Sequence, residues 1–113
     1  MVGTPTLYKE TFFSDALPNS QLMEYFGKLS DESFRVTLDM MGLDLPHSKR
    51  IKTPILVIGA AHDQSVLPKE YETTAKSYHT QPIMFNMNHN MMLEDDWLMA
   101  ANCILDWLKE RNL

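Results

Sequence analysis

The stretch Thr53-Pro-Ile-Leu-Val-Ile-Gly-Ala-Ala-His-Asp63 decides the predicted fold, because a continuous apolar run leads through a glycine into a short loop and an acid. Ile55–Ile58 is rich in β-branched residues, which is typical of a parallel strand buried on both faces. A second stretch, Pro82-Ile-Met-Phe-Asn-Met-Asn-His89, has the same form, with a short strand over Ile83–Met87 before a histidine. The sequence therefore predicts two strands, each followed by a polar residue.

A helix is expected after each strand. Pro68 stands where the first turn of a helix tolerates proline, and this helix should run to about Tyr78. A longer helix should start near Glu94–Asp96, acids that the helix dipole favours, and its apolar stripe extends from Trp97 to Leu108. Strand, helix, strand, helix is a βαβα unit, so the fold class is α/β with parallel strands and a right-handed crossover.

The chain before residue 50 has a helical pattern. Its apolar residues recur at helical spacing in two groups, namely Leu22, Tyr25, Phe26 and Leu29, then Phe34, Leu38 and Met41. Asn19 or Ser20 could cap the first helix, Ser30 or Asp31 the second, and Gly42 stands where a C-terminal cap belongs. The apolar residues 11–14 are too few to assign, and residues 45–54 are expected to form a linker.

Composition narrows the function classes. The 113 residues are 44% hydrophobic with a net charge of −5, and no basic stripe marks a nucleic-acid partner. The single cysteine, Cys103, allows neither an internal disulfide nor a cysteine metal cage, and it is expected to pack in the last helix. The longest apolar run, Ile55–Ala61, is too short to cross a bilayer, and the N-terminus lacks a signal-peptide pattern. We expect a cytoplasmic protein without a membrane span.

Asp63 and His89 are the candidate catalytic residues. Ligands bind beyond the carboxyl ends of parallel strands, and both side chains should emerge there, within reach of each other. A carboxylate bonded to one imidazole nitrogen fixes the tautomer, so that the other nitrogen can take a proton from a nucleophile. Taken alone, Asp63 could instead be a turn residue, and His89 a surface or capping histidine.

The chain resembles the C-terminal portion of an α/β-hydrolase of the lysophospholipase-like, esterase-type group. The resemblance rests on Pro54–Asp63, on His89-Asn-Met-Met-Leu-Glu94 and on Trp97 with the closing helix Ile104–Leu108, and it covers roughly residues 53–111. It implies that Asp63 is the triad acid and His89 the general base in hydrolysis of an ester or similar acyl bond. It also implies a helical cap-like segment over residues 1–50 and part of the hydrolase core over residues 51–113. No cofactor is implied.

The nucleophile of such an enzyme does not occur in the 113 residues. A Gly-x-Ser-x-Gly elbow needs glycines four apart, and Gly3, Gly27, Gly42 and Gly59 never are. The chain is therefore expected to be inactive unless an N-terminal hydrolase fragment supplies the serine. A dehalogenase-like reaction with an aspartate nucleophile is a related possibility that would lack its nucleophile too.

Two strands do not form a stable open sheet, so partners are expected. The partner is either the N-terminal fragment or a second copy, and a small ester-like molecule would be the substrate of the completed site. The alternative is a non-catalytic chain that acts as an assembly or interaction module through its open strand edge.

Other candidate sites have weaker patterns. His62, Asp63, His89 and Glu94 lack the spacing of metal ligands, so no metal is predicted. The pairs Met40–Met41 and Met91–Met92 could line an acyl pocket but are expected to fill gaps in a core. Glu94–Asp96 is interpreted as the start of a helix. No serine stands on a glycine-flanked strand-to-helix turn, whether Ser14, Ser20, Ser30, Ser33, Ser48, Ser65 or Ser77.

Overall fold

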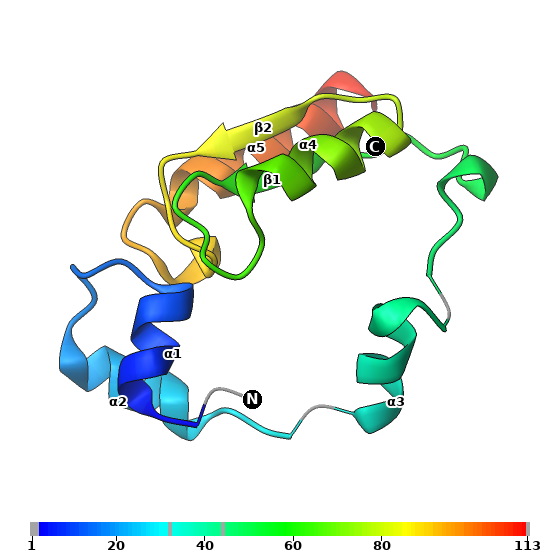
Figure 1. The fold of residues 1–113 in the computed structure, drawn as a ribbon. Helices are drawn as coiled ribbons and strands as arrows, with labels where there is room; N and C mark the ends of the chain where they lie inside the picture. Colours follow the sequence, from blue (N-terminus) through cyan, green and yellow to red (C-terminus); the bar gives the residue numbers. More distant parts are fainter. Residues whose placement is uncertain (1–2, 32, 44, 113) are drawn as a thin grey trace.

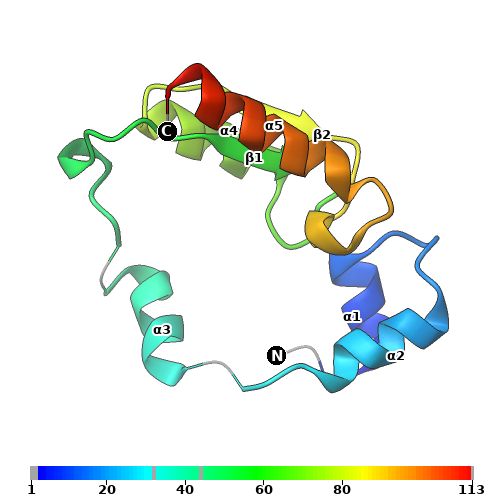
Figure 2. The same ribbon diagram turned by 180° about the vertical axis from the view of Figure 1, so that it is seen from behind.

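A computed structural model describes residues 3–31, 33–43 and 45–112 of the chain (Figure 1). It contains helices together with one two-stranded parallel sheet, which is compatible with the α/β class expected from the sequence. The sheet and its two helices form one unit, a pair of N-terminal helices lies at the end of this unit, and α3 lies apart from both in the two views (Figures 1 and 2).

The α/β unit runs in the expected order. Strand β1 (Val57–Ala60) leads through a loop to α4 (Pro68–Ser77), β2 (Pro82–Phe85) and α5 (Trp97–Glu110). The strands pair in parallel from Val57 opposite Pro82 to Ala60 opposite Phe85. The predicted first strand began at Ile55, two residues too early, because the ladder can begin only where β2 supplies a partner and β2 begins at Pro82.

Helices cover both faces of the sheet, as Figures 1 and 2 show from opposite sides. On the α5 face, Ala60, Phe85, Met87 and Ala100 form a buried cluster, with Ile58, Met91 and Cys103 packed against it. The expectation that Cys103 packs in the last helix is confirmed. On the other face, Ala75 of α4 is fully buried, and α4 packs mainly on β1. Each strand keeps one edge without a partner strand among the described residues.

The starts of α4 and α5 both agree with the sequence prediction. Pro68 opens α4, and Glu70 accepts a hydrogen bond from the backbone of Leu67 at 2.7 Å. Helix α5 begins at Trp97 with Asp96 at its N-cap position, so the prediction that it starts near Glu94–Asp96 is confirmed. The Glu94 carboxylate also accepts a hydrogen bond from the backbone of Ser14 at 2.9 Å.

The first two helices of the chain share a small core. Helix α1 (Pro5–Phe12), which the sequence analysis did not predict, packs against α2 (Asn19–Gly27). Their buried residues are Tyr8, Phe13, Leu17 and Leu22. Pro18 occupies the N-cap position of α2, so neither Asn19 nor Ser20 is its cap. Because proline fixes the backbone just before the helix, it sets the start without a side-chain hydrogen bond.

Helix α3 (Phe34–Leu38) leads into the π-helical segment η1 (Asp39–Leu43), which contains Gly42 at a φ of 111°, a backbone conformation that favours glycine. The N-cap of α3 is Ser33 rather than Ser30 or Asp31. Met40 and Met41 are 75% and 79% exposed, so the expectation that they fill a core is wrong. The reason is that α3 and η1 lie away from the sheet, and among the described residues neither of the two core clusters includes them (Figure 1).

Candidate active site

Asp63 lies just beyond the carboxyl end of β1, in a loop that remains tied to the second strand. The backbone of Ala61 donates to Phe85 at 2.8 Å and that of His62 to Met87 at 3.0 Å, which continues the strand pairing past the end of β1. The Asp63 side chain has no exposed surface. Its Oδ1 accepts hydrogen bonds from the backbone of Ser65 at 2.7 Å and of Val66 at 2.9 Å. These bonds fix the loop around the carboxylate.

His89 lies beyond the carboxyl end of β2 and meets Asp63, as expected from the two strand ends. The imidazole Nδ1 is 2.8 Å from Asp63 Oδ2. The carboxylate is fully buried, while the His89 side chain keeps 30% of its surface exposed. The pair therefore combines a buried carboxylate, held by hydrogen bonds, with an imidazole that is partly accessible to solvent.

Tyr71 is a third member of the site that the sequence analysis missed. Its hydroxyl donates a short hydrogen bond to Asp63 Oδ2, the same oxygen that His89 contacts. The tyrosine ring lies directly over Gly59, where a Cβ atom would come within 2.7 Å of the ring carbon Cγ. The signals in the sequence are the pair Tyr71 and Ala75, one turn apart on α4, and a glycine inside a strand, which often marks a close approach.

The hydrogen bonds settle the charges of the group. Burial by itself raises the pKa of Asp63, but the bonds from Tyr71, Val66, His89 and Ser65 outweigh it and hold the pKa below its usual range. Burial, followed by the neighbouring Asp63, raises the pKa of Tyr71 above its usual range. At neutral pH Asp63 is therefore ionised and Tyr71 is a neutral donor.

The charges determine which nitrogen of His89 carries the proton. An ionised carboxylate only accepts hydrogen bonds, so the Nδ1 that contacts it must donate. In the neutral ring Nε2 then holds a free lone pair. No described residue forms a hydrogen bond with Nε2. Nε2 is therefore the ring nitrogen that could accept a proton.

The segment at the end of α1 contacts the loop that carries His89. We call these contacts, between residues 12–14 and residues 88–94, the clasp. The backbone of Asn90 donates to Phe12 at 3.0 Å, and the Asn88 side chain donates to Phe13 at 3.0 Å. The ring centres of Phe12 and His89 are 5.1 Å apart in an edge-on arrangement. Residues about 75 positions away in the sequence therefore help to hold the imidazole.

Several residues considered in the sequence analysis lie outside this group. His62 is exposed and contacts Asn86 at 2.7 Å. Ser65 contributes its backbone to Asp63, and in the part of the chain that is described no serine, threonine or cysteine side chain bonds to His89. Met91 packs on the α5 core, whereas Met92 is 66% exposed. Within the same residues no cluster of three or more potential ligands could hold a metal.

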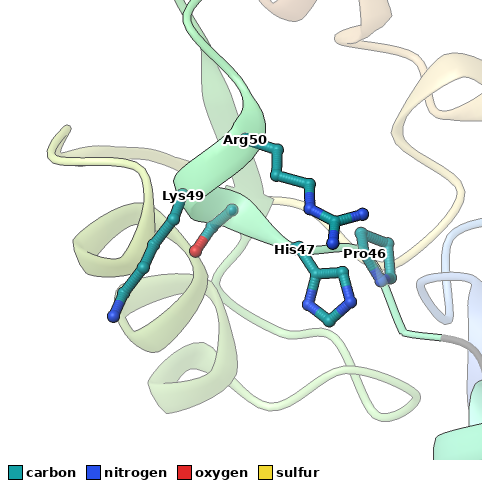
Figure 3. A pocket seen from close by; sticks show the side chains of 5 residues that line it. Pro46, His47, Lys49 and Arg50 are labelled. Atoms are coloured by element: carbon teal, nitrogen blue, oxygen red, sulfur yellow. The ribbon is translucent and has the colours of Figure 1, made fainter.

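A separate concave surface occurs in the linker, lined by the consecutive residues Pro46–Arg50 (Figure 3). Figure 3 shows Lys49 extending away from His47 and Arg50. A single short segment supplies every lining residue, so the hollow reflects the local 3₁₀ turn Ser48–Arg50 rather than packing between elements. Neither Asp63 nor His89 lines it.

Comparisons with known proteins give no family for the chain. No protein-family model, curated protein or solved structure matches it. Among the described helices, none has the length and apolar character needed to cross a bilayer. The feature that bears on function is therefore the hydrogen-bonded group around Asp63.

Proposed function

We propose that the chain supplies the general base and its orienting acid to a serine-type α/β-hydrolase that cleaves ester or similar acyl bonds. In this role His89 is the base, Asp63 orients it, and the serine comes from a polypeptide segment outside the 113 residues. The observation that supports the proposal is the buried Asp63 carboxylate 2.8 Å from Nδ1 of a partly exposed His89.

The chemistry follows from the free nitrogen. When the serine hydroxyl attacks the acyl carbon, Nε2 of His89 takes its proton, and the imidazolium then donates that proton to the leaving alcohol. A water molecule attacks the acyl-enzyme by the same route and releases the acid. Asp63 stays ionised throughout and stabilises the charged ring, while the clasp holds the ring in place.

A second candidate, an assembly or interaction module, has its own supporting observation. Apolar side chains of α5 face solvent, with Leu98 and Leu105 54% and 50% exposed. Both strands also keep an open edge. Such surfaces favour association. This role is compatible with the first, because a segment that carries the serine would have to dock somewhere on the chain.

Reconstitution tests the hydrolase proposal. The chain is mixed with the polypeptide encoded immediately upstream of it, and hydrolysis of p-nitrophenyl esters is followed. We expect negligible hydrolysis by the chain alone and clear hydrolysis by the mixture. His89→Ala in the mixture should lower kcat by roughly 10⁴-fold or more, as removal of a triad member does.

The matched control is His62→Ala, which removes a neighbouring exposed histidine that bonds to Asn86 and leaves Asp63 untouched. This variant should hydrolyse at the parent rate. The proposal is contradicted if hydrolysis survives His89→Ala, or if the upstream polypeptide contains no Gly-x-Ser-x-Gly turn.

A further inference from the structure

We propose that Tyr71 is a positioning residue for the Asp63–His89 pair: its hydroxyl fixes the Asp63 carboxylate so that His89 can bond to it in one orientation only. This inference rests on the proposed function for its catalytic meaning. Its structural content, the control of one side chain by another, can be tested on the chain alone.

Hydrogen bonds occupy both oxygens of the Asp63 carboxylate. An ionised carboxylate offers about four lone-pair sites on its two oxygens. Oδ1 of Asp63 accepts from the backbones of Ser65 and Val66, and Oδ2 accepts from Tyr71 and His89. With three of these sites taken by Ser65, Val66 and Tyr71, the orientation of the carboxylate is fixed and one site remains for His89 Nδ1.

The packing of α4 against β1 brings the Tyr71 hydroxyl to Asp63. Tyr71 lies in the first turns of α4, whose start is set by Pro68 and by the bond from the Leu67 backbone to Glu70. Its ring reaches Asp63 by crossing β1 at Gly59, where any Cβ atom would collide with it. Strand β1, the start of α4 and Gly59 together direct the Tyr71 hydroxyl to Asp63 Oδ2.

Tyr71 also affects the protonation of Asp63. The Tyr71 pKa is raised, so the phenol stays protonated and acts only as a donor. Hydrogen bonds to the charged form of a carboxylate lower its pKa, which keeps Asp63 from taking the proton that His89 carries. Tyr71 therefore orients and charges the acid without joining the proton transfer.

The test is Tyr71→Phe in the whole chain, which keeps the ring over Gly59 and removes only the hydroxyl. Carbon-13 NMR titration of the Asp63 carboxyl should show its pKa rising towards the ordinary value. The proton on His89 Nδ1, seen as a downfield NMR resonance, should broaden because the carboxylate gains a second orientation. The control is Tyr78→Phe, at the end of the same helix, whose hydroxyl forms no hydrogen bond to the described residues.

A second variant keeps the test decisive if Tyr71→Phe does not fold. Replacing Tyr71 by 3-fluorotyrosine makes the phenol a stronger donor, so the Asp63 pKa should fall further below its parent value. Both readouts use the chain without substrate. An unchanged Asp63 pKa and an unchanged Nδ1 proton resonance in either variant overturn the positioning role.

Catalysis in the reconstituted mixture then separates the two proposals. We expect Tyr71→Phe to lower kcat by roughly 10- to 100-fold with KM unchanged, as a displaced catalytic group does. If the NMR changes occur but no mixture hydrolyses esters, the proposed function fails and the positioning role stands. If the mixture hydrolyses esters and Tyr71→Phe leaves kcat and both NMR readouts unchanged, the positioning role fails alone.

Discussion

Gly59→Ala should disrupt the group around Asp63 by displacing the Tyr71 ring. A methyl group at this position would lie 2.7 Å from Tyr71 Cγ and 2.8 Å from both Tyr71 Cδ2 and Met84 Sδ. Ordinary contact starts at 3.4 Å, so the tyrosine ring must move by about 0.7 Å. The Met84 side chain can swing away, but the ring is tied to the backbone of α4.

The cost follows from two effects. Overpacking a tight site destabilises a fold by about 1–3 kcal/mol, and losing a hydrogen bond to a charged group adds about 1.5–3 kcal/mol. Alanine in a strand recovers about 0.5–1 kcal/mol relative to glycine. We therefore expect Gly59→Ala to lower the free energy of unfolding by about 2–5 kcal/mol.

Urea denaturation at pH 7, followed by circular dichroism, measures this loss. The control is Gly27→Ala at the end of α2, where no atom lies within 4 Å of the added methyl. In a Tyr71→Ala background both the ring and its hydrogen bond to Asp63 are gone, so Gly59→Ala should cost about 2.5–6 kcal/mol less than in the parent. The reasoning is refuted if Gly59→Ala unfolds at the parent urea concentration, or if its cost is the same without Tyr71.

Three further predictions concern Asp63, the clasp and the surface of α5. The Asp63 pKa is lowered by folding, so its stabilisation is complete above the ordinary value of 3.8 and disappears as the pH falls through the lowered value. Asp63→Asn should remove that acid dependence and cost about 1.5–3 kcal/mol at pH 7, and equal acid dependence of urea unfolding in both proteins would contradict this. Glu94→Ala should speed hydrogen exchange of the Ser14 amide and leave the strand amides unchanged, whereas unchanged exchange at Ser14 would mean that the clasp is not formed. Sedimentation should show concentration-dependent association that Leu98→Lys with Leu105→Lys suppresses, and a parent chain that is monomeric at every concentration would disprove it.

The sequence predicted the meeting of Asp63 and His89 because parallel strands carry their ends to one edge of a sheet. The same local pattern occurs two times in the sequence: an apolar run is followed by a loop and a polar residue. This pattern is sufficient to predict that Asp63 and His89 lie at the same edge of the sheet. The distance of 2.8 Å between Nδ1 and Oδ2 agrees with this expectation. The catalytic roles of the two residues remain predictions.

The parts that the sequence did not predict depend on contacts between distant segments. Tyr71 is one aromatic residue on a largely polar helix, and only the glycine of a neighbouring strand gives it room to reach Asp63. Helix α1 is eight residues long, and the clasp joins its end to residues about 75 positions later. Met40 has an apolar side chain, as core residues do, but it lies in η1, apart from the sheet, and is exposed (Figure 1). Local patterns do not encode such outcomes.

The orientation of the His89 ring is tested most directly by a nitrogen-15 NMR correlation spectrum of its imidazole, recorded on the unmodified chain at a pH where the ring is neutral. The spectrum distinguishes the two tautomers by the shifts of Nδ1 and Nε2. We predict that Nδ1 carries the proton, in a hydrogen bond to Asp63, and that Nε2 is bare. A ring protonated at Nε2, or an even mixture of tautomers, would contradict the assignment of His89 as a base oriented by Asp63.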